Sequence, residues 1–241
     1  MKKRLLFMLF CALTLQAAFA GKIHGTVRAQ TRLDSTSTNA ETHQSFVVFI
    51  EGITTTNPPT DLAPTVNVEA RRAPGQRGAI FSPHLLPVMR GTTVRWLNSD
   101  QVYHNVFSMS AAASFEMGQS EPVTDLQSPA IKQYTFDKPG RVDVLCSIHA
   151  NMNCIIYVMD NPWFSGTDRR GYYLIANLPS GIYKLRAWGE RVPSQVKEIT
   201  VTEDSDETID FVLGWAATPD PAPATNTAPT ITTNTVPTPA T

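Results

Sequence analysis

The chain has 241 residues, a formal net charge of −1 and 17% charged residues. Its length allows one large or two small domains once the two ends are set aside. The balanced charge, without a basic stripe, argues against nucleic acid as a partner. No segment after residue 20 is apolar over enough residues to cross a membrane.

Residues 1–20 have the layout of a secretory signal peptide. The basic start KKR precedes an apolar run and the small residues Ala18 and Ala20, so we expect cleavage before Gly21. The apolar run is too short to favour a membrane span. Loss of the three positive charges would change the net charge from −1 to −4 (−1 − 3). The sequence thus predicts a bacterial protein that is periplasmic or secreted.

Short runs of β-branched and aromatic residues, separated by Gly, Pro, Asn and Asp, fill the chain from residue 21 to residue 215. Such runs predict strands, and helical periodicity is scarce. One short helix is expected at 108–117. Many short strands with turns between them indicate an all-β chain of sandwiches. The expected strands cover 23–27, 45–51, 65–69, 92–97, 134–136, 142–146, 154–159, 172–176, 182–188, 196–201 and 208–213.

The segment 216–241 consists almost entirely of Ala, Thr, Pro and Asn. Such a composition offers too little apolar surface to offset the entropy lost on ordering, so we expect a disordered Thr/Pro/Ala-rich tail.

The segment CSIHANMNC (146–154) raises the question of function. Cys146, His149 and Met152 follow one another at intervals of three residues, and Cys154 closes the segment. In an oxidising compartment two remaining cysteines form a disulfide by default. A disulfide would leave the spacing of the histidine and the methionine without an explanation. Both interpretations, a disulfide and a metal-binding loop with Cys154 as a buried thiol, are open at this point.

A further histidine, His104, follows an expected strand and a polar turn in TTVRWLNSDQVYHNVFS (92–108). The fold can bring it close to the Cys146 segment. Two histidines and one cysteine with a weak axial methionine are the ligands of a blue-copper electron-transfer site. We therefore favour one copper ion, cycling between Cu(I) and Cu(II), with His104, Cys146, His149 and Met152 as ligands.

These segments resemble the cupredoxins, the blue (type 1) copper proteins, and amicyanin and plastocyanin in particular. The motif C-x-x-H-x-x-M matches residues 146–152, and H-N-V matches residues 104–106. The stretch FSPHLLPVMRGTTVRW (81–96) is similar to the family's F-x-P…V-x-x-G-x-x-V segment. The resemblance covers roughly 64–159 and implies a Greek-key β-sandwich with copper near one end. It also implies that Asn105 forms a hydrogen bond across to the Cys146 loop.

The stretch SGTDRRGYYLIANLPSGIYKLRAW (165–188) resembles the second half of a carboxypeptidase regulatory-like module. This resemblance implies a smaller transthyretin/Ig-like β-sandwich at 160–215. About fifty residues are few for a sandwich that stands alone. The strands in 21–63 either supply its first half or complete the copper domain, and both possibilities are open. The combination looks like proteins described as methylamine-utilisation-like.

These features predict a mononuclear copper protein that carries single electrons between redox partners and is not an enzyme. The partner is expected to dock near His149, whose far ring edge should face solvent. The alternative is a non-redox copper-handling module, or a glycan- or protein-binding β-sandwich with a vestigial metal site. The other histidines, His24, His43 and His84, have no metal-binding partners at suitable spacing and are expected to be surface groups.

Overall fold

A computed structural model describes residues 20–30, 36–37, 45–55, 65–72, 78–123 and 129–214. The expected tail, the expected signal peptide up to residue 19, and His43 lie outside these ranges. Across the described ranges every regular element is a strand, and the strands form four sheets. The prediction of an all-β chain built of sandwiches is confirmed. A search of the described residues for a helix long and apolar enough to span a membrane found none.

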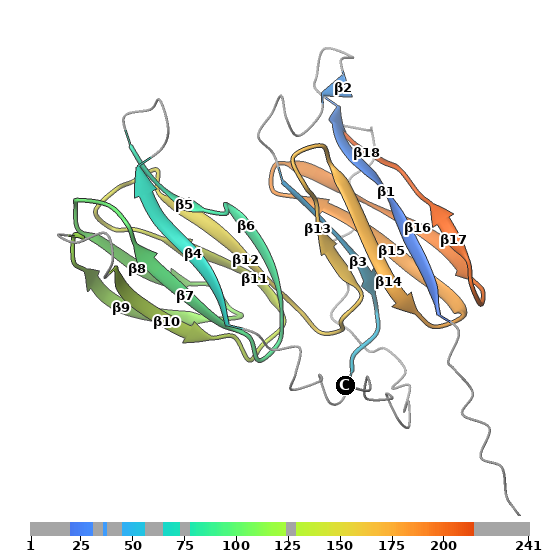
Figure 1. Cartoon of the computed structure of the whole chain (residues 1–241), viewed down its shortest axis with the longest axis horizontal. Helices are drawn as coiled ribbons and strands as arrows, with labels where there is room; N and C mark the ends of the chain where they lie inside the picture. The colour runs from blue at the N-terminus through green and yellow to red at the C-terminus, as the bar shows by residue number, and fades with distance from the viewer. Residues whose placement is uncertain are drawn as a thin grey trace, which may run out of the picture.

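The middle of the chain forms one sandwich, here called the middle sandwich (Figure 1). Its first sheet has the order β10-β7-β4-β5 and its second the order β6-β12-β11-β8-β9. Two pairs, β4 with β7 and β6 with β12, are parallel. Its strands are β4 (Thr65–Arg72), β5 (Ala79–Ser82), β6 (Leu85–Met89), β7 (Thr93–Asn98), β8 (His104–Met109), β9 (Ser114–Ser120), β10 (Ala130–Thr135), β11 (Gly140–Leu145) and β12 (Asn153–Met159).

The core of the middle sandwich follows from period-two alternation along its strands. In β7 the side chains of Val94 and Trp96 are buried, whereas their neighbours are partly exposed. In β11 Val142 and Val144 alternate in the same way and meet the first sheet from the opposite side. Burial of each large apolar side chain stabilises the fold by about 1.5–3 kcal/mol. Phe136, packed 6.2 Å from the Trp96 ring, adds to this core.

Strands from both ends of the described chain form a second sandwich, here called the terminal sandwich. Strand β1 pairs antiparallel with β14 and parallel with β17 and β18, and β3 pairs with β13 and β15. The N-terminal strands thus share sheets with strands that follow residue 160, and the middle sandwich lies between them in sequence. The strands are β1 (Gly21–Gln30), β2 (Thr36–Ser37), β3 (Phe46–Glu51), β13 (Phe164–Gly166), β14 (Tyr172–Leu178), β15 (Gly181–Gly189), β16 (Val192–Val201), β17 (Asp206–Thr208) and β18 (Phe211–Leu213).

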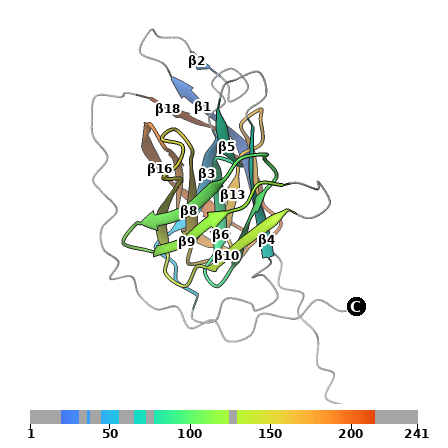
Figure 2. The ribbon, with the colours of Figure 1, turned by 90° about the vertical axis from the view of Figure 1, so that its left-hand side faces the viewer.

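The two sandwiches pack side by side, and the turned view places β8, β9 and β10 in front of the terminal sandwich (Figures 1 and 2). Their contact is apolar because β12 and β3 bury both of their faces. In β12, Ile156 faces the core of the middle sandwich, whereas Ile155 and Met159 face the terminal sandwich. In β3, Val48 faces the core of the terminal sandwich, and Val47 joins the contact.

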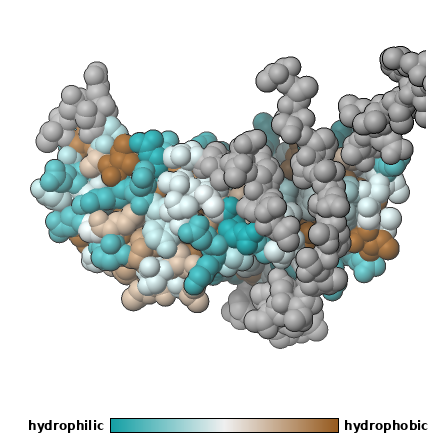
Figure 3. All heavy atoms as spheres, turned by 90° about the horizontal axis from the view of Figure 1, so that it is seen from below, coloured by the Kyte–Doolittle hydropathy of each residue, from teal (hydrophilic) through white to brown (hydrophobic). Residues whose placement is uncertain are grey.

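Aromatic rings complete the contact between the sandwiches. The ring of Tyr157 lies 5.6 Å from that of Phe49 and 5.1 Å from that of Trp188. The guanidinium of Arg141 lies 5.5 Å from the centre of the Trp188 ring. Viewed from below, the coloured surface is largely hydrophilic, with hydrophobic side chains in separate places (Figure 3).

The prediction of a helix at 108–117 is wrong. Strand β8 ends at Met109 and β9 begins at Ser114, with a turn between them. Alanine has the highest intrinsic helix propensity, but propensity is a weak signal that tertiary packing overrides. Phe115 and Met117 alternate with exposed residues and pack on the core, which requires an extended strand. The expected strand at 208–213 is two strands, β17 and β18.

Candidate metal site

Three strand ends position the candidate ligands. His104 is the first residue of β8, Cys146 follows the end of β11, and the loop 146–152 leads into β12. Strands β8 and β11 are antiparallel neighbours, with Leu145 opposite Phe107. This pairing brings His104 and Cys146 to the same end of the middle sandwich although 42 positions separate them.

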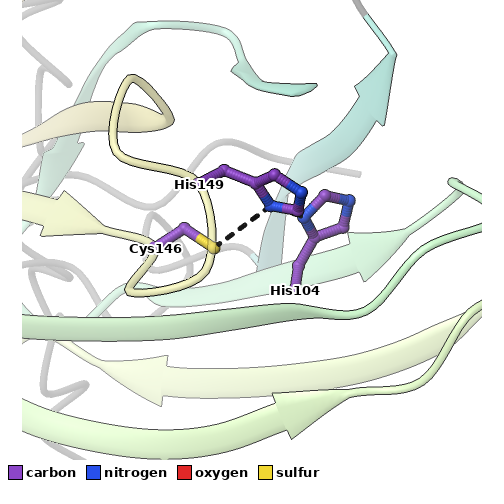
Figure 4. Close-up of side chains that lie close together, drawn as sticks. All are labelled: His104, Cys146 and His149. Carbon is purple, nitrogen blue, oxygen red and sulfur yellow. Dashed lines mark hydrogen bonds between the residues drawn. The ribbon is translucent and has the colours of Figure 1, made fainter. Parts of the chain in front are cut away.

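The side chains of His104, Cys146 and His149 converge (Figure 4). The Nδ1 atoms of the two histidines lie 3.2 Å apart, and the Sγ atom of Cys146 lies 3.8 Å from Nδ1 of His149. One ligand atom from each residue lies within 4.8 Å of the others. His104 is 0% exposed and Cys146 5% exposed, whereas His149 is partly exposed. The group is shielded on the protein side and open only at His149.

The donor set and its spacing fit a soft metal ion. Metal–nitrogen bonds of about 2.0 Å and metal–sulfur bonds of about 2.3 Å place such donors about 3–4 Å apart. Two of the three separations, 3.2 Å and 3.8 Å, fall in this range, and the third is at most 4.8 Å. Imidazole and thiolate together suit copper, because sulfur favours Cu(I) and imidazole favours Cu(II).

Met152 lies at the far end of the same loop and is 1% exposed. Its backbone N–H donates to the carbonyl of His149 at 2.9 Å, and its carbonyl accepts from the N–H of Cys146 at 3.1 Å. These two hydrogen bonds close the loop on itself. The Met152 side chain belongs to the same apolar core as Cys146. These hydrogen bonds thus hold the backbone of Cys146, His149 and Met152, three of the ligands expected from the sequence, in one compact loop.

Asn105 connects strand β8 with the loop. Its Oδ1 accepts a hydrogen bond from the N–H of Ser147 at 2.7 Å, and its Nδ2 donates to Oε1 of Glu116 at 3.0 Å. The same Glu116 oxygen accepts from the N–H of Gly118 at 2.9 Å, so β9 holds the amide in place. The Asn105 side chain therefore holds Ser147, which follows Cys146, close to strand β8, in which His104 precedes Asn105.

Asp100 contacts the other side of the His104 ring. Its Oδ2 lies 3.4 Å from Nε2 of His104, and its backbone N–H donates to Oδ1 of Asn98. Burial lowers the pKa of His104, and the hydrogen bond that its Nε2–H donates to Asp100 opposes that shift only in part. A lowered pKa keeps the imidazole neutral, the form that binds a metal. The Nδ1 atom of His104 is then available to an ion, while Nε2 faces the carboxylate.

Both cysteines of the described chain are free thiols, which disfavours the disulfide interpretation. Cys154 lies in β12 opposite Val144 and points into the core of the middle sandwich. Burial raises the pKa of Cys154 to about 12. It therefore stays protonated at neutral pH and is a poor ligand.

The remaining described histidines lie outside this group. His24 pairs with Asp206 at 3.0 Å. His84, expected to be a surface group, is 43% exposed but contacts Glu190 and the backbone of Asn153. Sequence reasoning also assigned no role to Asp100 or Glu116. A weak signal existed for Asp100, which lies four residues before His104 in a polar turn, whereas Glu116 fell in the segment expected to be helical.

Comparison with protein-family models and with curated proteins finds no match. Among solved structures, the chain is similar to a purple cupredoxin from Nitrosopumilus maritimus, with 23% identity over 39% of this chain and 99% of that one and a TM-score of 0.32. It is also similar to a copper-containing nitrite reductase from Thermus scotoductus, with 25% identity over 40% of this chain and 23% of that one and a TM-score of 0.33. A reduced Cu(I) form of an amicyanin variant matches with 22% identity over 39% of this chain and 82% of that one, at a TM-score of 0.31.

Proposed function

We propose that this protein carries single electrons through one type 1 copper ion. The observation that supports the proposal is the convergence of the Nδ1 atoms of His104 and His149 with the Sγ atom of Cys146. Cys146 would supply a thiolate, His104 and His149 two imidazole nitrogens, and Met152 a weak thioether ligand. A copper ion bound by this set would supply one-electron chemistry between Cu(II) and Cu(I).

The surroundings of the ligands suit rapid electron transfer because they hold the donor atoms in place. His104 starts a paired strand, and the backbone hydrogen bonds between Cys146, His149 and Met152 close the loop. Asn105 ties the loop to β8. Groups that are fixed in this way rearrange little between oxidation states. The protein would then be a carrier and not an enzyme, as expected from the sequence.

The partner would dock over His149, the one candidate ligand that is partly exposed. Large apolar side chains next to the two histidines are exposed: Val102 by 36%, Tyr103 by 49% and Ile148 by 43%. Exposed apolar side chains at this end of the sandwich suit a contact with another protein. Export by the expected signal peptide would place this exchange in the periplasm or outside the cell.

Copper titration and voltammetry of the chain without residues 1–20 test the proposal. We expect one copper ion per chain and a reversible one-electron couple with copper retained in both states. His149→Ala should lose the couple, whereas His24→Ala, a histidine outside the site, should keep it. Copper that is bound but not reversibly reduced would contradict electron transfer and favour copper handling.

A further inference from the structure

The terminal sandwich is connected through one histidine to the start of β12, the strand that follows the candidate ligand Met152. The contact is made by His84, in the turn between β5 and β6, and Glu190, in the turn between β15 and β16. Nε2 of His84 lies 2.8 Å from Oε2 of Glu190. Nδ1 of the same ring lies 3.2 Å from the carbonyl oxygen of Asn153.

Both partners of the His84 ring are oxygen acceptors. A carboxylate and a carbonyl only accept, so the ring donates to both when each nitrogen carries a proton. The backbone of His84 makes a third contact, because its carbonyl accepts from the N–H of Ile155 at 2.7 Å. His84 therefore holds two residues of β12, Asn153 and Ile155, on the strand that leaves the loop.

The turn that carries Glu190 is itself fixed. A Cβ atom at Gly189 would lie 2.7 Å from the ring of Phe46 and 2.9 Å from Val192, so the backbone is packed tightly there. Glu190 is only 24% exposed, and the guanidinium of Arg191 lies 4.0 Å from it. The apolar contact between Val47 and the outer face of β12 keeps the two turns close together. A rigid support on the terminal sandwich thus faces His84.

We propose that Glu190, through His84, positions the metal-binding loop, so that the terminal sandwich is part of the support of the site. His84 and Glu190 are positioning residues and touch none of the four candidate ligands in the contacts described above. The inference concerns the loop of the protein itself, and its consequence for copper rests on the proposed function. It gives the terminal sandwich a role in setting the properties of a site in the other sandwich.

Amide hydrogen exchange in the copper-free full chain, resolved by NMR, tests the inference. In Glu190→Ala and His84→Ala, the amides of Cys146, Met152 and Ile155 should exchange about threefold to tenfold faster, the factor expected for the loss of one hydrogen bond. Glu190→Gln keeps an acceptor oxygen for His84 and should restore most of the protection. Glu198→Ala, an exposed glutamate on β16, is the matched control and should leave these amides unchanged.

In the copper-loaded chain, Glu190→Ala should also change the copper hyperfine splitting, and Glu198→Ala should not. Unchanged exchange of the loop amides in both alanine variants would overturn the inference, as would faster exchange spread evenly over β4 and β7. If the loop responds but the wild-type protein forms no type 1 copper spectrum, the positioning role stands and the proposed function fails. The copper-free measurement thus separates the two.

Discussion

Replacement of Asn105 by alanine tests whether the hydrogen bond between β8 and the loop holds the site together. Asn105 is 7% exposed, and its Oδ1 accepts from Ser147 at 2.7 Å. The substitution removes that bond and the one that Asn105 donates to Glu116. Because Ser147 is exposed and water can replace its partner, we expect a loss of about 1–2 kcal/mol in the free energy of unfolding.

The same substitution should also weaken copper binding. Removal of a group that orients a metal ligand lowers metal affinity by about 10-fold to 100-fold. Guanidinium unfolding of the copper-free protein and competition titration with a copper chelator measure the two effects. Asn151→Ala, in the exposed part of the same loop, is the control and should change neither. Wild-type affinity in Asn105→Ala would refute the reasoning.

Three further predictions concern other parts of the structure. Asp100→Asn keeps an acceptor oxygen but removes the negative charge 3.4 Å from His104, and should lower copper affinity by about 10-fold in the same titration; an unchanged affinity would mean that this charge does not contribute to copper binding. Cys154, with a pKa of about 12, should resist thiol reagents at pH 8 until the protein unfolds, and labelling of Cys154 in the native protein would contradict its burial. Hydrogen bonds from Thr26 lower the pKa of Asp210, so the stability that they provide should be complete above about pH 3.8 and be lost as the pH falls through the lower folded value. Because Asp210 is exposed and asparagine keeps an acceptor oxygen, Asp210→Asn should lose less than about 1 kcal/mol at neutral pH. It should flatten this acid dependence in urea unfolding, and a wild-type acid profile would exclude the contribution.

The strands were largely predictable because their side chains alternate or form short apolar runs. The apolar runs in β3 and β12 also indicated that two sandwiches pack together, because a strand that is apolar on both faces must be buried by other elements on both sides. That consequence was not drawn from the sequence. The expected strands did not include β5, β6, β8, β9 or β13. Strand β9 was missed because Ala111–Ala113 suggested a helix and its polar exposed face hid its period of two.

The loop 146–152 could be proposed as a candidate metal-binding loop from the sequence, because three of its residues are close together and have the donor types of one metal. The supporting contacts could not. Glu116 reaches Asn105 only through the pairing of β8 with β9, and His84 meets Glu190 across 106 positions of the chain. Such contacts depend on strand register and on the docking of two sandwiches, which no local pattern in one sequence specifies.

The visible and electron paramagnetic resonance spectra of the copper-loaded protein test the central claim most directly. With cupric ion, the wild-type chain and Cys154→Ala should both show an intense sulfur-to-copper charge-transfer band and a narrow copper hyperfine splitting. Cys146→Ser, which removes only the sulfur, should be nearly colourless with a wide splitting. A colourless wild-type protein, or a blue Cys146→Ser variant, would contradict the account.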